Sequence, residues 1–329
     1  MADCSDIFIS FSNSLSLTRT AIRYLRAART SVKKKITKYL SGSTKPLKVE
    51  FRGQGSFTMD TIIKPLAGEY DLDLGVYIKE QSKWREDWPA PETISQRLKD
   101  ALKNHTSQEP INKKKCVRLI YQPIDKSRNI SYHVDLPIYI QHRNFWGDTV
   151  TRIGINGPTQ WSQISDPIGL AKWFNKTCQK NSTDKNQLIR IVKYIKAWKS
   201  FKSSGTKFPS GIALTVLMAN SYSPHERDDI AFRETIRKAY NSYFSWYGLV
   251  GMEDIINPVV SGASLIEGLN KKQKDNFKTC FEQLVDDAKI AVQHQDRSSA
   301  LMIWEKHFDT RFKSLYEPLW FVKKINLNK

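Results

Sequence analysis

Residues 51–78, FRGQGSFTMDTIIKPLAGEYDLDLGVYI, decide the fold: a Gly-Ser turn and a short helical segment lead into a strand that carries two acids. Along that strand, apolar residues at every second position alternate with Asp71 and Asp73. Because side chains two residues apart on a strand project to the same side, both carboxylates share one face. The pattern predicts a strand with one face in a core and the other presenting negative charge.

Two carboxylates this close repel each other, and each raises the pKa of the other unless a cation lies between them. Magnesium suits such a position because it prefers oxygen ligands and completes its shell with phosphate oxygens and water. An Asp-x-Asp pair alone is common, and it more often consists of two solvated acids at a strand edge than of metal ligands. The turn that precedes this pair favours the metal site.

Gly55-Ser56 follows a predicted strand over 47–52 and precedes a helical run over 57–64 that Pro65 ends. Backbone N–H groups at the start of a helix, together with the Ser56 hydroxyl, can bind terminal phosphate oxygens. Glycine at position 55 lets phosphates approach without a Cβ in the way. Turn and strand together predict a site that holds a nucleoside triphosphate on metal ions.

Two-metal phosphoryl transfer needs a third carboxylate, and Asp135 is the candidate. In residues 132–138, YHVDLPI, the apolar neighbours of Asp135 share one parity, whereas Asp135 and His133 share the other. Asp125 and Asp148 are less favoured because each lies in a loop-like stretch. His133 is either a second ligand or, more commonly for a histidine beside a carboxylate, a hydrogen-bonded structural residue.

Three further side chains are candidates for binding phosphate. Ser210 is placed as the N-cap of a helix, where its hydroxyl and the next N–H groups can meet an anion. Lys196 lies on the preceding helix, although Lys193 and Lys199 share that helix and lysines are usually solvated. Arg118 has the parity opposite to its apolar neighbours on a predicted strand, so it either holds a phosphate or is simply exposed.

The chain of 329 residues is long enough for two lobes. We predict an α+β fold: a catalytic lobe over 1–165 with a central mixed sheet, and a helical lobe over 166–329. An N-terminal helix over 12–40 would span roughly 40 Å and brace both lobes. The predicted strands cover 47–52, 70–78, 116–122 and 132–140, and the other predicted helices cover 91–105, 167–180, 186–201, 210–221, 228–247, 271–295 and 299–316.

Composition narrows the class of protein. The net charge of +19 favours polyanionic partners such as nucleotides, nucleic acid or an anionic surface, unless it is only a solvated basic surface. The four cysteines form no CxxC pair, which argues against a disulfide framework and a zinc ribbon. No apolar run approaches the ~20 residues of a membrane helix, and no basic segment precedes the first apolar stretch. We expect a cytoplasmic protein.

Taken together, Gly55-Ser56, Asp71-x-Asp73 and Asp135 resemble the DNA polymerase β-like nucleotidyltransferase superfamily. Within it, the Gln54-Gly55-Ser56-Phe57 turn, the long N-terminal helix and the segments 196–199 (KAWK) and 208–213 (FPSGIA) resemble the bacterial CD-NTase family, related to cyclic GMP-AMP synthase. The resemblance covers about residues 12–320. It implies that Asp71, Asp73 and Asp135 are catalytic and hold two Mg²⁺ ions, with Mn²⁺ as a substitute, and that Gln54, Gly55, Ser56, Lys196 and Ser210 bind nucleotide.

The resemblance also implies an activity: Mg²⁺-dependent, template-independent joining of nucleoside triphosphates, ATP among them, with release of pyrophosphate. The product would be a cyclic di- or trinucleotide second messenger that acts on a separate effector in bacterial anti-phage (CBASS) signalling. The enzyme would be a monomer that requires neither membrane nor nucleic acid. The animal enzyme's zinc-binding insert has no counterpart, and residues 325–329 lack the small C-terminal residue that some members use for conjugation.

Two other hypotheses remain. The same fold is compatible with an enzyme that adds nucleotides to an RNA end or to a protein acceptor. A protein of a different class, a non-catalytic basic protein that binds nucleic acid, would have the same charge with vestigial acids. Three converging acids argue against that hypothesis, because a scaffold gains nothing from them.

Overall fold

The computed structural model describes residues 1–65, 70–79, 88–125, 130–155, 161–180, 184, 186–203, 205–244 and 252–317, so the C-terminal residues 325–329 lie outside it. The chain divides into two compact units. One, here called the sheet unit, comprises Leu17–Met59 and Pro65–Lys172. The other, the helical unit, comprises Met1–Ser16, Asp60–Lys64 and Trp173–Lys329.

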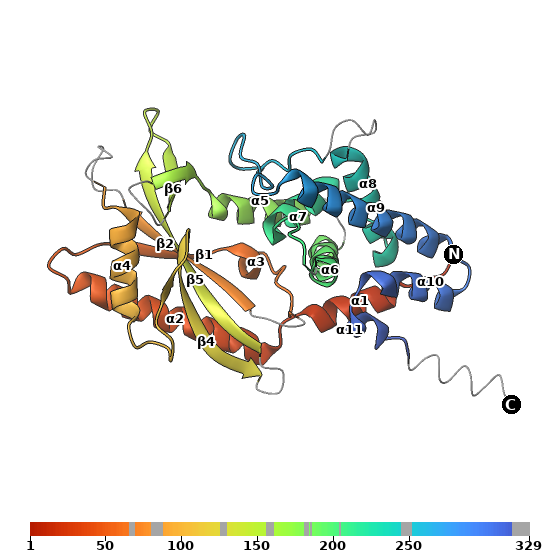
Figure 1. Ribbon diagram of the computed structural model, residues 1–329, viewed down its shortest axis with the longest axis horizontal. Helices are drawn as coiled ribbons and strands as arrows, with labels where there is room; N and C mark the ends of the chain where they lie inside the picture. The colour runs from red at the N-terminus through yellow and green to blue at the C-terminus, as the bar shows by residue number, and fades with distance from the viewer. Residues whose placement is uncertain are drawn as a thin grey trace. The chain divides into compact units, whose positions relative to one another are not determined.

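In the sheet unit, the strands of the described residues form one seven-stranded sheet (Figure 1). Five strands follow the order β1-β2-β5-β4-β3, while β6 pairs with β5 and β7 pairs with β6. Strands β2 and β5 are parallel and the other pairs antiparallel, which confirms the predicted mixed sheet. The bounds are β1 Val49–Gly53, β2 Tyr70–Lys79, β3 Ile111–Asn112, β4 Cys116–Asp125, β5 Ile130–Arg143, β6 Thr149–Gly154 and β7 Trp161–Ile164.

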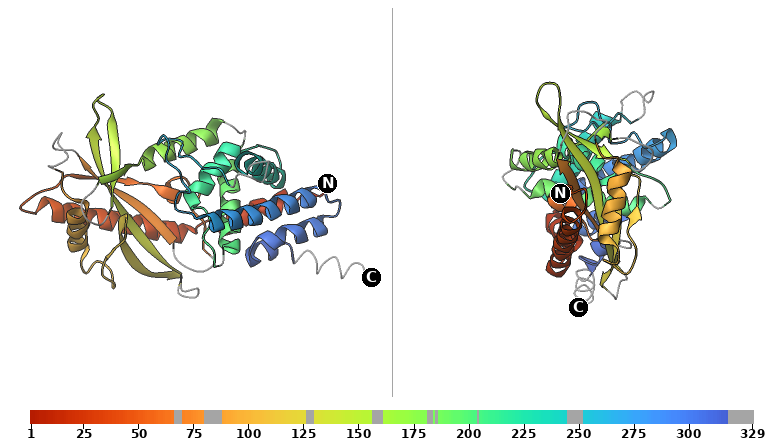
Figure 2. Two further views of the ribbon diagram at one scale, coloured as in Figure 1. Left: turned by 45° about the horizontal axis from the view of Figure 1, so that its top comes forward. Right: turned by 90° about the vertical axis from the view of Figure 1, so that its left-hand side faces the viewer.

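Helices α2 (Arg19–Ser41) and α4 (Pro91–Leu102) pack against one face of this sheet (Figures 1 and 2). Residues spaced three or four apart on α2, such as Val32 and Ile36, are fully buried there. They meet the apolar side of β2, where Leu72 and Leu74 are buried as the alternation predicts. With the apolar side chains gathered on that face, the opposite face of β2 and β5 carries the polar ones.

The helical unit has a core rich in aromatic residues. Phe8 on α1 lies 4.9 Å, between ring centroids, from Trp304 and 5.1 Å from Tyr194. Its helices in the described residues are α1 Ser5–Leu15, α6 Gln187–Lys202, α7 Gly211–Ser221, α8 Asp228–Tyr243, α9 Lys271–Gln293, α10 Arg297–Trp304, η2 Glu305–His307 and α11 Thr310–Lys313, while α5 Pro167–Lys180 crosses from one unit to the other.

The expected helix over 12–40 is helical but interrupted. Residues 16–18 separate α1 from α2, because Ser16 and Thr18 have extended backbones and the Thr18 hydroxyl caps α2 by accepting the Ala21 N–H at 3.1 Å. Residues 1–16 pack with the helical unit, and so do Asp60–Lys64. The compact units thus differ from a single division at residue 165 by two exchanged segments.

Other element boundaries also differ from the predictions. Helix α3 (Gly55–Thr58) is shorter than the expected 57–64, since the backbone of Asp60 is left-handed with a φ of 55°. The run 299–316 is broken by extended backbone at Phe308, after which Asp309 caps α11. Strands β3, β6 and β7 were not predicted, and each is short and lacks a sustained apolar alternation.

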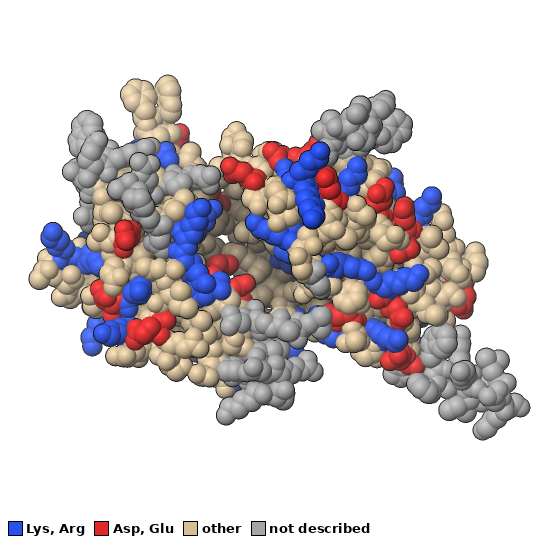
Figure 3. Space-filling view, in the orientation of Figure 1, with Lys and Arg blue, Asp and Glu red and all other residues tan. Residues whose placement is uncertain are grey.

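The charge excess is distributed over the surface. On the face shown in Figure 3, basic side chains lie over both units, interspersed with acidic ones. Total charge therefore does not by itself locate a surface for nucleic acid. Within the described part of the chain, no helix combines the length and the apolar composition that crossing a bilayer requires.

Candidate active site

The register of β2 and β5 brings the three predicted acids together. Asp73 pairs with Asp135 and Asp71 with His133 on these adjacent parallel strands. Their side chains therefore share the face of the sheet that α2 and α4 leave uncovered. The disfavoured acids lie elsewhere: Asp125 ends β4, and Asp148 lies in the exposed turn before β6.

The carboxylates do not carry equal charge. Burial raises the pKa of Asp73 to about 7, and repulsion from Asp135 and Asp71 contributes to the rise. Burial acts to raise the pKa of Asp71, but the hydrogen bond and charge of His133, together with the charge of Arg118, outweigh it, and the pKa falls below its ordinary value. His133 is buried, and the same contact raises its pKa although burial alone would lower it. His133 thus orients Asp71.

The Arg118 guanidinium balances the negative charge of the Asp135 carboxylate. The register of β4 and β5 places the two residues opposite each other. The guanidinium donates from Nε to Oδ1 and from Nη2 to Oδ2, both at 2.7 Å, and Nη2 lies 3.7 Å from Asp71 Oδ1. Arg118 does project to the polar face, as its parity indicates, but in this structure its fork binds a carboxylate.

The donor set fits a divalent cation. Asp71, His133 and Asp135 offer ligand atoms that all lie within 4.8 Å of one another. Carboxylate oxygens are the ligands that hard divalent ions prefer. Repulsion from Asp135 and Asp71 adds to burial in raising the pKa of Asp73, and a divalent cation would relieve that repulsion.

The Gly-Ser turn lies directly against these acids. The Gln54 N–H donates to the Asp73 carbonyl at 3.3 Å, and α3 then begins at Gly55 with a φ of 69°. A Cβ at position 55 would collide with Asp73 Oδ2, so the carboxylate occupies the space that glycine leaves. Ser56 follows with a half-buried side chain. The turn and the acids therefore form one site.

Lys196 and Ser210 lie together in the helical unit. Ser210 caps α7 by accepting the Ala213 N–H at 3.1 Å, and a Cβ at Gly211 would lie 3.6 Å from Lys196 Cε. The Lys196 ammonium donates to both oxygens of Thr61, at 2.8 Å to Oγ1 and 3.0 Å to the carbonyl. Burial and then the charge of Lys199 lower the pKa of Lys196 to about 7. Sequence reasoning missed Thr61, which lies in a loop without periodicity.

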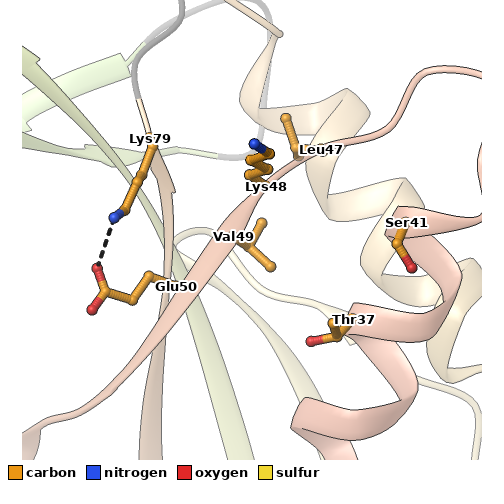
Figure 4. A pocket seen from close by; sticks show the side chains of 7 residues that line it. All are labelled: Thr37, Ser41, Leu47, Lys48, Val49, Glu50 and Lys79. Carbon is orange, nitrogen blue, oxygen red and sulfur yellow. Dashed lines mark ion pairs between the residues drawn. The ribbon is translucent and has the colours of Figure 1, made fainter.

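A pocket elsewhere in the sheet unit is unrelated to this site. It lies where the end of α2 meets the start of β1 (Figure 4) and includes the 4.0 Å ion pair of Lys79 and Glu50. At the rise of a β-strand, Lys79 is about 20 Å along β2 from Asp73. The full lining is Thr37, Ser41, Leu47, Lys48, Val49, Glu50 and Lys79.

The comparisons with known proteins agree with this geometry. Residues 49–139, which contain the turn and all three acids, match the family model described as cyclic GMP-AMP synthase DncV-like, nucleotidyltransferase domain. Across 95% of this chain and 98% of the other, the structure resembles Vibrio cholerae DncV cyclic AMP-GMP synthase in complex with the linear intermediate 5′ pppA(3′,5′)pG, with a TM-score of 0.73 and 16% identity. Residues 49–139 thus match a nucleotidyltransferase domain in sequence, and the fold and the geometry of the site agree with that match.

Two curated relatives narrow the class. A cyclic GMP-AMP synthase of Escherichia albertii is 28% identical over 241 residues, 70% of this chain and 51% of the relative. A cyclic AMP-AMP-AMP synthase of an Acinetobacter species is 30% identical over 156 residues, 45% of this chain and 43% of the relative. The matched part thus spans about half the length of these relatives. The chain is therefore similar to bacterial cyclic-nucleotide synthases, and its residues 49–139 match the DncV-like nucleotidyltransferase domain.

Proposed function

We propose that this protein is a metal-dependent, template-independent nucleotidyltransferase that condenses nucleoside triphosphates into a cyclic di- or trinucleotide and releases pyrophosphate. One observation carries the proposal: Asp71, Asp73 and Asp135 converge on adjacent parallel strands directly beside the Gly55-Ser56 turn. The names of the relatives, a cyclic GMP-AMP synthase and a cyclic AMP-AMP-AMP synthase, support a cyclic product.

The three carboxylates would hold two Mg²⁺ ions, for which Mn²⁺ can substitute. When bound, these ions lower the pKa of the attacking 3′-hydroxyl and offset the charge that develops on the phosphates. The N–H groups and hydroxyl of Gly55-Ser56 would orient the terminal phosphates. Lys196 and Ser210 would bind the triphosphate, and Arg118 would turn from Asp135 to a phosphate once the carboxylate is neutralised.

We extend the proposal to the biological setting that the resemblance implies. We propose that the protein acts as a monomer in the cytoplasm on triphosphates that include ATP, without a nucleic-acid activator. Its cyclic product would activate a separate effector protein in anti-phage (CBASS) signalling. No membrane contact is needed, since substrates and product are all water-soluble polyanions.

The test is incubation of the protein with Mg²⁺ and the four labelled ribonucleoside triphosphates, followed by phosphatase and mass spectrometry. A phosphatase-resistant oligonucleotide is expected with the wild type and with Asp148→Ala, whose exposed carboxylate lies outside the site. Asp73→Ala should form none while remaining folded, because it loses a metal ligand and is relieved of charge repulsion.

Two additions to this experiment, an acceptor molecule and an RNA-binding assay, distinguish the other hypotheses. Product that appears only when an RNA or protein acceptor is added would identify an acceptor-dependent transferase. Salt-sensitive RNA binding that persists in Asp73→Ala, without turnover under any condition, would identify a non-catalytic nucleic-acid-binding protein. Turnover that persists after chelation of the metal would contradict the metal-dependent chemistry proposed for the three carboxylates.

A further inference from the structure

Beyond the acids, the same sheet face carries a stacked pair of tyrosines. Tyr77 pairs with Tyr139 across β2 and β5, in the parallel register that also pairs Asp73 with Asp135. Their ring centroids are 4.7 Å apart with planes inclined by 17°, and their side chains are 1% and 3% exposed. Burial raises the pKa of both phenols, so both hydroxyls remain protonated hydrogen-bonding groups.

Gln54 lies against these tyrosines rather than in solvent. Its side chain is 6% exposed, and both ends of its amide are occupied. The amide Nε2 donates to Tyr139 Oη at 2.8 Å, while the Tyr77 hydroxyl donates to Gln54 Oε1 at 3.3 Å. Both the nitrogen and the oxygen of the amide that we expected to line the nucleotide pocket are thus engaged by tyrosine hydroxyls.

Gly75 makes room for this arrangement. It lies on β2 between Asp73 and Tyr77, and a Cβ there would lie 2.5 Å from Gln54 Oε1 and 2.6 Å from Tyr77 Cε2. A side chain at this position would thus displace the glutamine amide. The amide of Gln54 fills a gap in the polar face that the sequence leaves open with glycine.

We propose that Gln54, Tyr77 and Tyr139 form a clamp that positions the Gly55-Ser56 turn over Asp73. Gln54 is the last residue before the turn, and its backbone N–H is bound to the Asp73 carbonyl. Fixing both its backbone and its side chain determines where the next N–H groups point. The three are positioning residues, because their polar groups are engaged with one another; the proposal rests on the proposed function for its effect on catalysis.

The decisive variant is Tyr139→Phe, which keeps the ring and leaves the buried Gln54 amide without its acceptor. Tyr121→Phe is the matched control: Tyr121 stacks on Tyr132 at 4.6 Å in the same sheet, and its hydroxyl lies 3.0 Å from His105 Nε2. Each variant removes one tyrosine hydroxyl contact from a cross-strand stacked pair. Of the two substituted tyrosines, Tyr139 contacts Gln54 and Tyr121 contacts His105.

The first readout is amide hydrogen exchange without nucleotide, at Gln54 and at Met59, whose N–H donates to the Gly55 carbonyl. In Tyr139→Phe we expect both amides to exchange about 10-fold faster, equivalent to about 1.4 kcal/mol of lost protection. Tyr121→Phe should leave them unchanged at a comparable unfolding temperature. Equal exchange at these amides in the two variants would overturn the clamp, whatever happens to activity.

The second readout is steady-state kinetics. Tyr139→Phe should lower kcat about 10-fold more than Tyr121→Phe does. The double variant Gln54→Met/Tyr139→Phe should lose less than the sum of the two single losses, because both changes remove the bond between Gln54 and Tyr139. Fully additive losses would overturn the proposal. If the wild type forms no oligonucleotide, the proposed function fails, yet hydrogen exchange still decides whether the clamp holds the turn.

Discussion

The protonation state of Asp73 depends chiefly on its burial and then on the neighbouring acids. Its pKa of about 7 in the metal-free protein lies above the ordinary 3.8, chiefly through burial and then through Asp135 and Asp71. Between these two pH values the folded state binds more protons at this site than the unfolded chain does. The contribution of Asp73 to the free energy of unfolding therefore falls as pH rises from about 4 to about 7.

A bound divalent cation reverses this dependence, since it must displace the proton. We predict that stabilisation by Mg²⁺, measured as the rise in unfolding temperature at a fixed ion concentration, is larger at pH 8 than at pH 6. Below pH 7 the apparent affinity should fall by up to about tenfold per pH unit. Asp73→Asn should flatten this dependence, and a pH-independent effect of Mg²⁺ in the wild type would contradict the assignment.

Lys196 offers a second residue-scale prediction. Its amine is desolvated, with a pKa of about 7, and is oriented by Thr61. Lys196→Met should weaken binding of a non-hydrolysable ATP analogue about 10-fold near pH 7, as expected for loss of one charge-assisted contact. The difference from wild type should shrink at higher pH, where the amine is neutral. Calorimetry can measure this, and Lys199→Met is the control, since a matching loss there would argue for a general charge effect.

At the scale of elements, the turn between β1 and β2 depends on a glycine for two reasons. Gly55 has a φ of 69°, and a Cβ would meet the Asp73 carboxylate. Gly147→Ala is a control that introduces backbone strain without a steric collision. Gly147 has a φ of 84°, and a Cβ there would have nothing within 4 Å. Comparing Gly55→Ala with Gly147→Ala therefore separates the effect of backbone strain from the effect of steric collision.

We predict that Gly55→Ala abolishes product formation, whereas Gly147→Ala retains it. Both should lose about 1 kcal/mol of stability from the left-handed backbone, and Gly55→Ala should lose more in addition. Product assays and denaturant unfolding give the two measurements. Near wild-type turnover in Gly55→Ala would mean that the turn tolerates displacement from Asp73.

At the scale of the whole molecule, the N-terminal helix is part of the helical unit's core. Phe8 is fully buried, with ring contacts to residues from α6, α8, α10 and α11 and to Phe308. Phe8→Ala should cost about 3–5 kcal/mol of stability, the usual range for a large buried aromatic residue. Ile9→Ala, at a position 40% exposed on the same helix, should cost much less in thermal unfolding. Equal shifts in the two variants would contradict the role of the buried Phe8 ring in this core.

Local periodicity explains why so much of the fold was predictable. The alternation in 70–78 and 132–140 is complete within each strand, so it assigns faces without knowledge of the partner. The predicted strands and most helices appear within a few residues of their expected bounds. Breaks such as residues 16–18 were missed because a capping hydroxyl like Thr18 interrupts a helix without interrupting its apolar pattern.

The sequence by itself determined the strands, the shared face of Asp71 and Asp73, the outward parity of Asp135 and the glycine turn before the acids, because each follows from spacing along the chain. The register of β2 and β5, which is a tertiary feature, brings Asp135 beside Asp73. The tertiary structure decided which partner each polar group takes. Gln54 meets Tyr139 across 85 residues, and Lys196 meets Thr61 across 135. Hydrogen bonds need atoms within about 3 Å, and only the register of distant segments brings those atoms so close.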